Sequence, residues 1–191
     1  MQQEHSSQQT KSAVFTIPNL LSCFRLLLIP VIIHAYLHQD NALLTAGLVA
    51  LSGLTDIADG FIARHFHMVS DLGKALDPVA DKLTQIAVLG CLTARHPLML
   101  LPLALLVVKE IAAGVMGLLV IHRTGEVHGA EWHGKISTAL LYATMTLHLL
   151  WDGLPTGLSH GLIFLCTGMI LYSCMRYTAK NIRLMQHKAN A

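Results

Sequence analysis

Residues 56–81 read DIADGFIARHFHMVSDLGKALDPVAD, and this stretch determines how the rest of the chain is interpreted. Four of its five aspartates, Asp56, Asp59, Asp77 and Asp81, lie inside segments that are otherwise apolar enough to span a membrane. An ionisable group in a bilayer span costs several kcal/mol unless it pairs with another charge, a cation or water. The four aspartates therefore predict a functional site at membrane depth.

The composition is that of an integral membrane protein. Of the 191 residues, 53% are hydrophobic and only 13% are charged, against roughly 25% charged in an ordinary soluble domain. The apolar stretches are continuous and do not alternate with period two, which favours helices over a barrel. We therefore predict an all-α, polytopic membrane protein with six transmembrane helices, at about residues 18–38, 42–64, 76–95, 97–122, 134–151 and 158–178.

The first residues are polar and rich in Gln and Ser, so they cannot bury enough apolar area to fold alone. We predict a flexible cytoplasmic leader at residues 1–16 and a single six-helix domain at residues 17–185.

Basic residues orient the predicted bundle, because loops rich in Lys and Arg stay on the cytoplasmic side. The opposite side contributes only Arg95, whereas the side predicted to be cytoplasmic carries Lys11, Arg64, Lys74, Arg123, Lys135, Lys180, Arg183 and Lys188. We expect a multi-pass plasma-membrane protein with both termini and the opening of the aspartate cluster in the cytoplasm. The one-sided charge suits an anionic lipid surface. Nucleic acid is not an expected partner, since no soluble basic domain is present.

The spacing of the aspartates predicts two acidic faces. Residues three or four apart share a helix face, so Asp56 lies with Asp59, and Asp77 with Asp81. Four carboxylates this close cannot all ionise without a compensating cation. All-oxygen ligands select hard ions such as Mg²⁺ or Mn²⁺. Four carboxylates suffice for two ions, the arrangement that commonly supports displacement at phosphorus.

The residues between the aspartates suit a phosphate ligand. Gly60 and Ala63 leave a smooth strip on which a base or a diphosphate can approach the backbone. Arg64 offers a planar fork that matches phosphate oxygens, and Gly73 is expected to let the loop turn before the third span. The alternatives are that the pair Asp59-Gly60 forms a turn, or that single aspartates serve a proton relay or an ion pathway.

The full pattern D-x2-D-G-x2-A-R-x8-G-x3-D-x3-D resembles the signature of the CDP-alcohol phosphotransferase family. Members of that family are six-span membrane enzymes, commonly homodimers, which transfer a substituted phosphate from a CDP-linked alcohol to a second alcohol and release CMP. The resemblance implies that Asp56, Asp59 and Asp77 are metal ligands and that Asp81 is the remaining ligand and the general base. The residues that it implies for binding the CDP moiety are Gly60, Ala63, Arg64 and Gly73.

Two further segments resemble bacterial phosphatidylglycerophosphate synthases and the related cardiolipin synthases, which use CDP-diacylglycerol. They are IPNLLSCFRLLLIP at residues 17–30 and GKIST at residues 134–138. The resemblance implies an enzyme of phospholipid biosynthesis that transfers a phosphatidyl group from CDP-diacylglycerol to glycerol 3-phosphate. Synthases for glycerol phosphate tend to carry Arg-Glu in the fourth span and another Arg two turns later, where this chain has Lys109-Glu110 and then Gly117. This loss of a cation keeps cardiolipin synthesis, with phosphatidylglycerol as acceptor, as the alternative.

Three cations outside the motif have competing interpretations. Lys109, beside Glu110 in the fourth span, either forms an interhelical ion pair or holds the acceptor phosphate. Arg25 and Lys135 either extend to lipid headgroups or bind an anionic acceptor, and for Lys135 we favour the acceptor. A cation or proton transporter would also explain the carboxylates. It would not explain the glycine, alanine and arginine spacings, and the inverted repeats common in transporters are absent.

Overall fold

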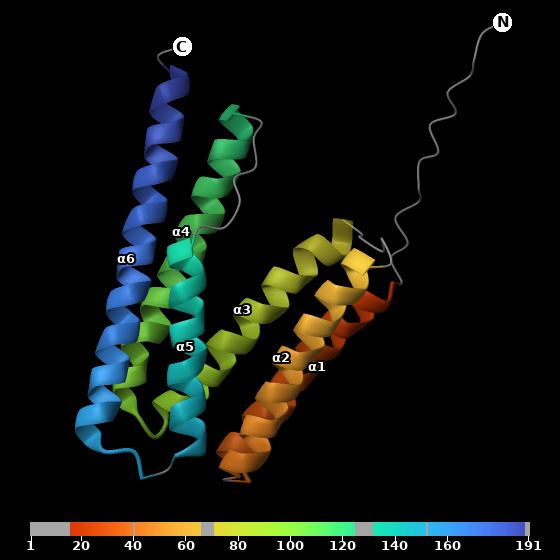
Figure 1. Ribbon diagram of the computed structural model, residues 1–191, viewed down its shortest axis with the longest axis vertical. Helices are drawn as coiled ribbons and strands as arrows, with labels where there is room; N and C mark the ends of the chain where they lie inside the picture. Colours follow the sequence, from red (N-terminus) through yellow and green to blue (C-terminus); the bar gives the residue numbers. More distant parts are fainter. Residues whose placement is uncertain (1–15, 40, 66–70, 125–131, 152, 190–191) are drawn as a thin grey trace, which may run out of the picture. The chain divides into compact units, whose positions relative to one another are not determined.

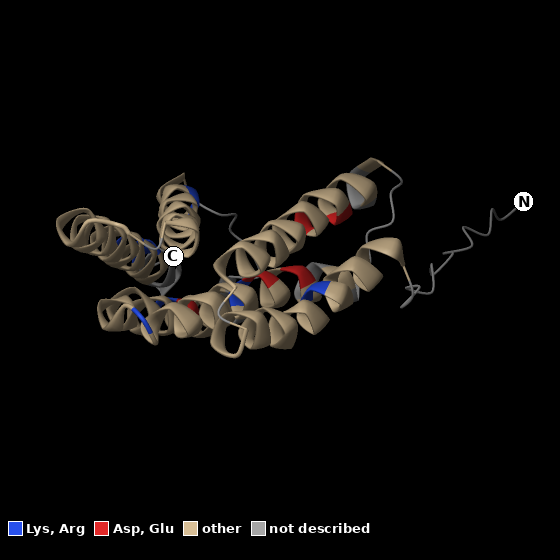
Figure 2. Ribbon diagram, turned by 90° about the horizontal axis from the view of Figure 1, so that it is seen from below, with Lys and Arg blue, Asp and Glu red and all other residues tan. Residues whose placement is uncertain are grey.

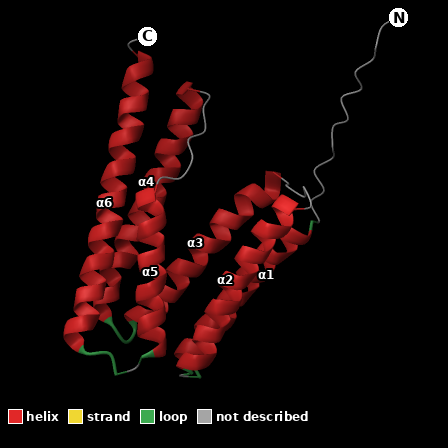
Figure 3. Ribbon diagram, in the orientation of Figure 1, coloured by secondary structure: helices red, strands yellow, loops and turns green. Residues whose placement is uncertain are grey.

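The computed structural model describes residues 16–39, 41–65, 71–124, 132–151 and 153–189, and within these ranges the chain is helical and contains no strand (Figure 1, Figure 3). The elements are α1 (Ile17–Leu37), α2 (Ala42–His65), α3 (Asp71–Thr93), the short 3₁₀ helix η1 (Pro97–Met99), α4 (Leu100–Thr124), α5 (Trp132–Leu150) and α6 (Thr156–Ala189). The predicted all-α class and the order of six helices are confirmed. The predicted leader lies outside the described residues, except for Thr16.

Polar side chains mark the starts of the first two helices. The Leu44 amide donates to Asn41 Oδ1 at 2.9 Å, which caps the N-terminus of α2. The Asn19 amide lies 3.4 Å from Thr16 Oγ1, a longer contact of the same kind at the start of α1. These caps place the helix starts within a residue or two of the predicted ones.

Helix α3 begins at Asp71, five residues before the predicted third span. Gly73 therefore lies buried in the first turn of a helix, and the prediction that it turns a loop was wrong. The predicted span started at residue 76 because it was drawn from the apolar residues alone. The helix itself also includes the polar residues that precede them.

Among the described residues, four helical segments are long and apolar enough to cross a membrane: Ile17–Leu37, Ala42–Ile62, Pro97–Val120 and Thr156–Arg183. Their large apolar side chains are often exposed, as with Leu20, Leu43 and Leu118. Helices α3 and α5 are less apolar than these four segments, since α3 carries several charged residues and α5 more polar ones. That α3 and α5 also span the membrane stays a prediction.

The chain divides into two compact units, which are described separately. The N-terminal unit comprises residues 1–32 and 47–84, and the C-terminal unit comprises residues 33–46 and 85–191. In the C-terminal unit α6 packs against both α4 and α5 (Figure 1). Its core is mainly apolar and includes Leu89, Leu92, Met99, Leu106, Leu141, Met145, Leu149, Ile163 and Ile170.

The interior of the N-terminal unit is polar. Asn19, Ser22 and Arg25 are buried on α1, and Asp59 is buried on α2. Positions 19, 22 and 25 are three apart, so they share one face of α1. The fold thus gathers polar groups from helices that are otherwise apolar.

Candidate active site

An arginine lies at the centre of the aspartate cluster. Helix α2 supplies Asp56 and Asp59, and α3 supplies Asp77. Figure 2 shows the acidic positions of the chain in red. Arg25 Nη2, from α1, lies 2.8 Å from Asp59 Oδ2 and 3.3 Å from Asp77 Oδ1, and Arg25 Nη1 donates to Asp56 Oδ1. The structure therefore brings together three of the four predicted metal ligands, around a cation that belongs to the chain itself.

A serine on the same face of α1 also holds Asp77. The Ser22 hydroxyl contacts Asp77 Oδ1 and lies 3.0 Å from the Pro18 carbonyl oxygen. A hydroxyl has one hydrogen, so it donates to one of these acceptors at a time. Asp77 precedes Pro78, which lies inside α3 and removes one backbone N–H from the helix at this point. Side chains of α1 thus contact Asp77 where the backbone bonding of α3 is interrupted.

The cluster is closed on one side and open on the other. The side chains of Arg25 and Asp59 are each 2% exposed, whereas those of Asp56 and Asp77 are 46% and 36% exposed. The Arg25–Asp59 pair forms the buried floor, and Asp56 and Asp77 form the accessible edge. An ion or a phosphate group would approach across that edge.

Asp81 stands apart from the contacts of Arg25. It follows Asp77 by four residues on α3, which places both on the same helix face. Its carboxylate is 26% exposed, and Oδ2 lies 3.8 Å from Lys82 Nζ. Asp81 is therefore an accessible carboxylate about one helical turn from the cluster.

The residues expected to bind the CDP moiety are only partly described. Gly60 follows Asp59 inside α2, so the Asp-Gly pair forms part of a helix and the interpretation as a turn was wrong. Gly73 is buried near the start of α3. Ala63 and Arg64 belong to the last turns of α2, but their side chains lie outside the described part of the chain.

The expectations for Arg25, a lipid headgroup or an acceptor, were wrong, because its side chain is buried against three carboxylates. The sequence did contain a signal for this. Asn19, Ser22 and Arg25 recur every three residues in an otherwise apolar helix, and such a polar stripe predicts a buried polar contact.

The donor atoms of the cluster fit a hard divalent cation, since they are all carboxylate oxygens. The arrangement does not yet provide a metal site: within the described ranges, no three acidic, histidine or cysteine residues are placed to hold one ion. Arg25 contacts the oxygens that would bind it. The carboxylate oxygens therefore suit a divalent metal ion by their chemistry, but in this structure they contact Arg25.

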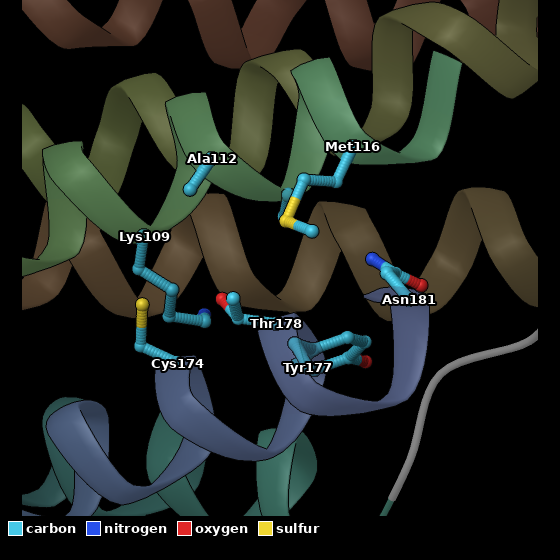
Figure 4. Close-up of a pocket in the computed structure, with 8 residues that line it drawn as sticks. Lys109, Ala112, Met116, Cys174, Tyr177, Thr178 and Asn181 are labelled. Carbon is cyan, nitrogen blue, oxygen red and sulfur yellow. The ribbon is translucent and has the colours of Figure 1, made fainter. Parts of the chain in front are cut away.

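Lys109 lies in a pocket between α4 and α6 in the C-terminal unit (Figure 4). The pocket is small, with a cavity volume of about 10 Å³, and its lining consists of Lys109, Ala112, Ala113, Met116, Cys174, Tyr177, Thr178 and Asn181. Lys109 is buried, extends toward Thr178, and places Nζ 2.8 Å from Glu110 Oε1. This ion pair lies within α4, so the prediction of an interhelical pair was wrong.

Tyr177 connects this pocket with the segment Gly134-Lys135. A Cβ atom at Gly134 would lie 3.3 Å from Tyr177 Cε2, so the start of α5 packs directly on the tyrosine ring. The neighbouring His133 ring meets Tyr177 edge-on at 5.2 Å. Lys135 itself is exposed. The α6 residues of the pocket, Tyr177 among them, belong to no motif, and sequence reasoning missed them.

Comparison with known proteins gives the family. The family model described as CDP-alcohol phosphatidyltransferase matches residues 15–174. A protein of Streptomyces coelicolor named cardiolipin synthase (CMP-forming) is 36% identical over 149 residues, which cover 73% of this chain and 67% of that protein. A Rickettsia felis protein named CDP-diacylglycerol–glycerol-3-phosphate 3-phosphatidyltransferase is 38% identical over 97 residues, 49% of this chain and 53% of that protein.

A human cardiolipin synthase (CMP-forming) is 41% identical over 97 residues, 50% of this chain. The match covers only 32% of the human protein, so this chain corresponds to about a third of that relative and to about half of the Rickettsia felis one. The family match, by contrast, extends over most of this chain and contains Arg25 and all four aspartates of the cluster. The chain therefore belongs to the CDP-alcohol phosphatidyltransferase family.

Proposed function

We propose that this protein transfers a phosphatidyl group from CDP-diacylglycerol to glycerol 3-phosphate, which releases CMP and forms phosphatidylglycerophosphate. Family membership supports the reaction class, and the name of the Rickettsia felis relative supports these substrates. The rival hypothesis of a cation or proton transporter has no support from the family. The observation that carries the proposal is the convergence of Asp56, Asp59 and Asp77, with Asp81 one helical turn away.

The aspartates are proposed to bind the diphosphate of the donor through Mg²⁺ or Mn²⁺. Asp56, Asp59, Asp77 and Asp81 are the proposed ligands of up to two ions. When bound, such ions neutralise phosphate charge and stabilise the charge that develops on the leaving oxygen. Gly60, Ala63, Arg64 and Gly73 are proposed to bind the CDP moiety, Arg64 through its guanidinium.

Asp81 is the proposed general base. The acceptor hydroxyl oxygen attacks the phosphorus that bears the diacylglycerol, the bond from that phosphorus to the CMP oxygen breaks, and CMP leaves with the electron pair. Asp81 takes the hydroxyl proton. A carboxylate is a weak base for an alcohol, so it accepts the proton late, when the attacking oxygen has become acidic. The partial exposure of Asp81 supports this role, since an acceptor can reach it.

Lys109 and Lys135 are proposed to bind the phosphate of the acceptor. Lys109 is buried, pairs with Glu110 and lines the pocket. The positive charge of its ammonium group therefore lies at the pocket. Hydroxyl, amide and phenol groups of Thr178, Asn181 and Tyr177 line the same pocket and provide additional hydrogen-bonding groups.

Cardiolipin synthesis is the second candidate. Gly117 stands where an arginine would add a cation for a phosphate acceptor, and the relatives from Streptomyces coelicolor and human are both named cardiolipin synthase. The acceptor would then be phosphatidylglycerol, with the same donor and the same leaving group.

An acceptor panel separates these candidates. Purified protein in detergent micelles receives CDP-diacylglycerol and Mg²⁺, and CMP release is measured with glycerol 3-phosphate, phosphatidylglycerol, inositol phosphate or no acceptor. We expect release with glycerol 3-phosphate alone, and a rate lower by about 10² to 10⁴-fold from Asp81→Asn protein prepared in parallel. Release with phosphatidylglycerol would transfer the assignment to cardiolipin synthesis. Silence with every acceptor, in folded protein, would reject the donor.

We further propose that the protein is a multi-pass protein of the plasma membrane, that its site faces the cytoplasm, and that it forms a homodimer. The one-sided distribution of Lys and Arg supports the orientation. Labelling of single cysteines at Lys135 and Arg95 from either side of sealed vesicles tests it. Crosslinking in membranes tests the dimer, since a monomer alone would contradict that part of the proposal.

A further inference from the structure

Arg25 is unusual in the degree to which the protein encloses it. It is 1% exposed, yet it is among the longest of the side chains and carries a permanent charge. Its two terminal nitrogens contact carboxylates of three residues on two other helices, Asp56, Asp59 and Asp77. Breaking a buried charged contact is strongly unfavourable, so Arg25 stabilises this arrangement of α1, α2 and α3.

The charges around Arg25 do not balance. When all three carboxylates are ionised they face one guanidinium, which leaves a formal charge of two negative units in the cluster. Asp81 contributes a fourth carboxylate nearby, and it has Lys82 at 3.8 Å. A residual charge of this size is what one divalent cation neutralises. The cluster therefore retains an electrostatic capacity for an ion although Arg25 already contacts its oxygens.

The contacts of Arg25 are also incomplete. Its Nε is buried and has no hydrogen-bond partner. Buried polar groups in native proteins are nearly always paired, and an exception needs an explanation. An arginine that served only to fix the helices would be expected to use all of its donors. The unpaired Nε instead fits a side chain whose contacts with the carboxylates change between a metal-free and a metal-bound cluster.

We propose that Arg25 is a resident cation that holds Asp56, Asp59 and Asp77 together while no divalent ion is bound, and that it competes with that ion for the same carboxylate oxygens. This inference rests on the metal requirement in the proposed function. Arg25 is a positioning residue in this account, and the reacting groups do not include it. Its effect is to hold the carboxylates of Asp56, Asp59 and Asp77 between the helices without a metal and to weaken the binding of the first ion.

Binding of Mn²⁺ in the absence of donor and acceptor tests this competition. Free Mn²⁺ is followed by electron paramagnetic resonance during titration of four proteins in the same detergent: wild type, Arg25→Gln, Arg25→Lys and Arg176→Gln. Arg176 is exposed on α6 in the C-terminal unit, so its replacement removes one positive charge without touching the cluster. Melting temperatures with and without Mn²⁺ are recorded for each protein.

Arg25→Gln is expected to bind Mn²⁺ at least about tenfold more tightly than wild type, because the competing charge is gone. Its metal-free melting temperature should fall, and Mn²⁺ should raise it by more than in wild type. Arg25→Lys keeps the positive charge but has fewer hydrogen-bond donors, so its affinity for Mn²⁺ should lie between those of wild type and Arg25→Gln. Arg176→Gln should match wild type.

An affinity for Mn²⁺ that is unchanged or weaker in Arg25→Gln would overturn the inference, because a purely structural arginine does not compete. If Arg25→Gln cannot be purified folded, Arg25→Lys decides alone, and wild-type affinity in that variant would overturn the inference. Absence of saturable Mn²⁺ binding in all the proteins would overturn it too. The acceptor panel tests the proposed function separately, so a wrong substrate assignment leaves the order of affinities unaffected.

Discussion

The N-terminal unit buries a cluster of charged side chains, whereas most of the polar side chains buried in the C-terminal unit, apart from Lys109, are neutral. In the first, Arg25 of α1 pairs with the buried Asp59 of α2 and also contacts Asp56 of α2 and Asp77 of α3. In the second, His148 Nε2 lies 2.8 Å from Ser159 Oγ, and His133 Nδ1 lies 3.2 Å from Ser173 Oγ, so each histidine joins α5 to α6. Neutral hydrogen bonds between helices suffice to orient a bundle. Buried charges need a further purpose, and the purpose proposed for this cluster is chemistry at phosphorus.

The largest expected effect comes from removing the proposed base in the N-terminal unit. Asp81→Asn should lower the rate of CMP release by about 10² to 10⁴-fold, the usual contribution of a general base. Binding of CDP-diacylglycerol should persist, because the other three aspartates remain. Donor binding and turnover are measured on the same preparation. Wild-type turnover in this variant would remove Asp81 from the role of base.

A change in the C-terminal unit should affect the acceptor alone. Lys109→Met removes the buried cation of the α4–α6 pocket and should raise KM for glycerol 3-phosphate by about tenfold or more, the value of a charged hydrogen bond. KM for CDP-diacylglycerol should stay near that of wild type. Lys180→Met is the control, since Lys180 lies on α6 but does not line the pocket. An equal rise in both KM values would assign Lys109 to packing.

The neutral hydrogen bonds of the C-terminal unit should matter for stability and not for chemistry. Ser159→Ala leaves the buried His148 Nε2 without the serine hydroxyl and should lower the free energy of unfolding by about 1–3 kcal/mol. Thr146→Ala, at an exposed position of α5, is the matched control. Thermal melting in detergent measures both variants. Equal melting temperatures for the two would show that the His148–Ser159 contact does not stabilise the bundle.

Gly134→Ala should have the smallest effect. Alanine in place of helical glycine usually stabilises by about 0.5–1 kcal/mol, and Gly168→Ala on α6 should show this gain, because a Cβ there meets nothing within 4 Å. At Gly134 the new methyl group would lie 3.3 Å from the Tyr177 ring, so the gain should be reduced or reversed. The two melting temperatures are compared directly. Identical gains would mean that the start of α5 does not press on Tyr177.

The two units also differ in what their sequences disclose. Spacings of three and four residues predicted that Asp56 shares a helix face with Asp59, and Asp77 with Asp81, and the helices α2 and α3 agree with this. The central position of Arg25 was not predicted, because it lies 31 residues before Asp56 and only tertiary packing brings them together. The walls of the Lys109 pocket were not predicted either, since Tyr177 and Asn181 are ordinary residues whose role depends on which face of α6 meets α4.

The local structure was predictable where polar residues cap helices and uncertain where they do not. Asn41 caps α2 close to its predicted start. The start of α3 was placed too late, because residues 71–75 mix apolar and charged residues and hydropathy gives no boundary there. The interhelical partner expected for Lys109 proved to be its own neighbour Glu110, a contact that helical spacing rules disfavour.

The central claim is that the aspartate cluster of the N-terminal unit carries out phosphatidyl transfer with a divalent cation. The most direct test is CMP release from CDP-diacylglycerol and glycerol 3-phosphate after complete chelation and then after return of Mg²⁺. The account predicts no release in chelator, full recovery with Mg²⁺, and no recovery in Asp59→Asn, which lacks the buried carboxylate. Release that continues at the same rate in chelator would contradict the account.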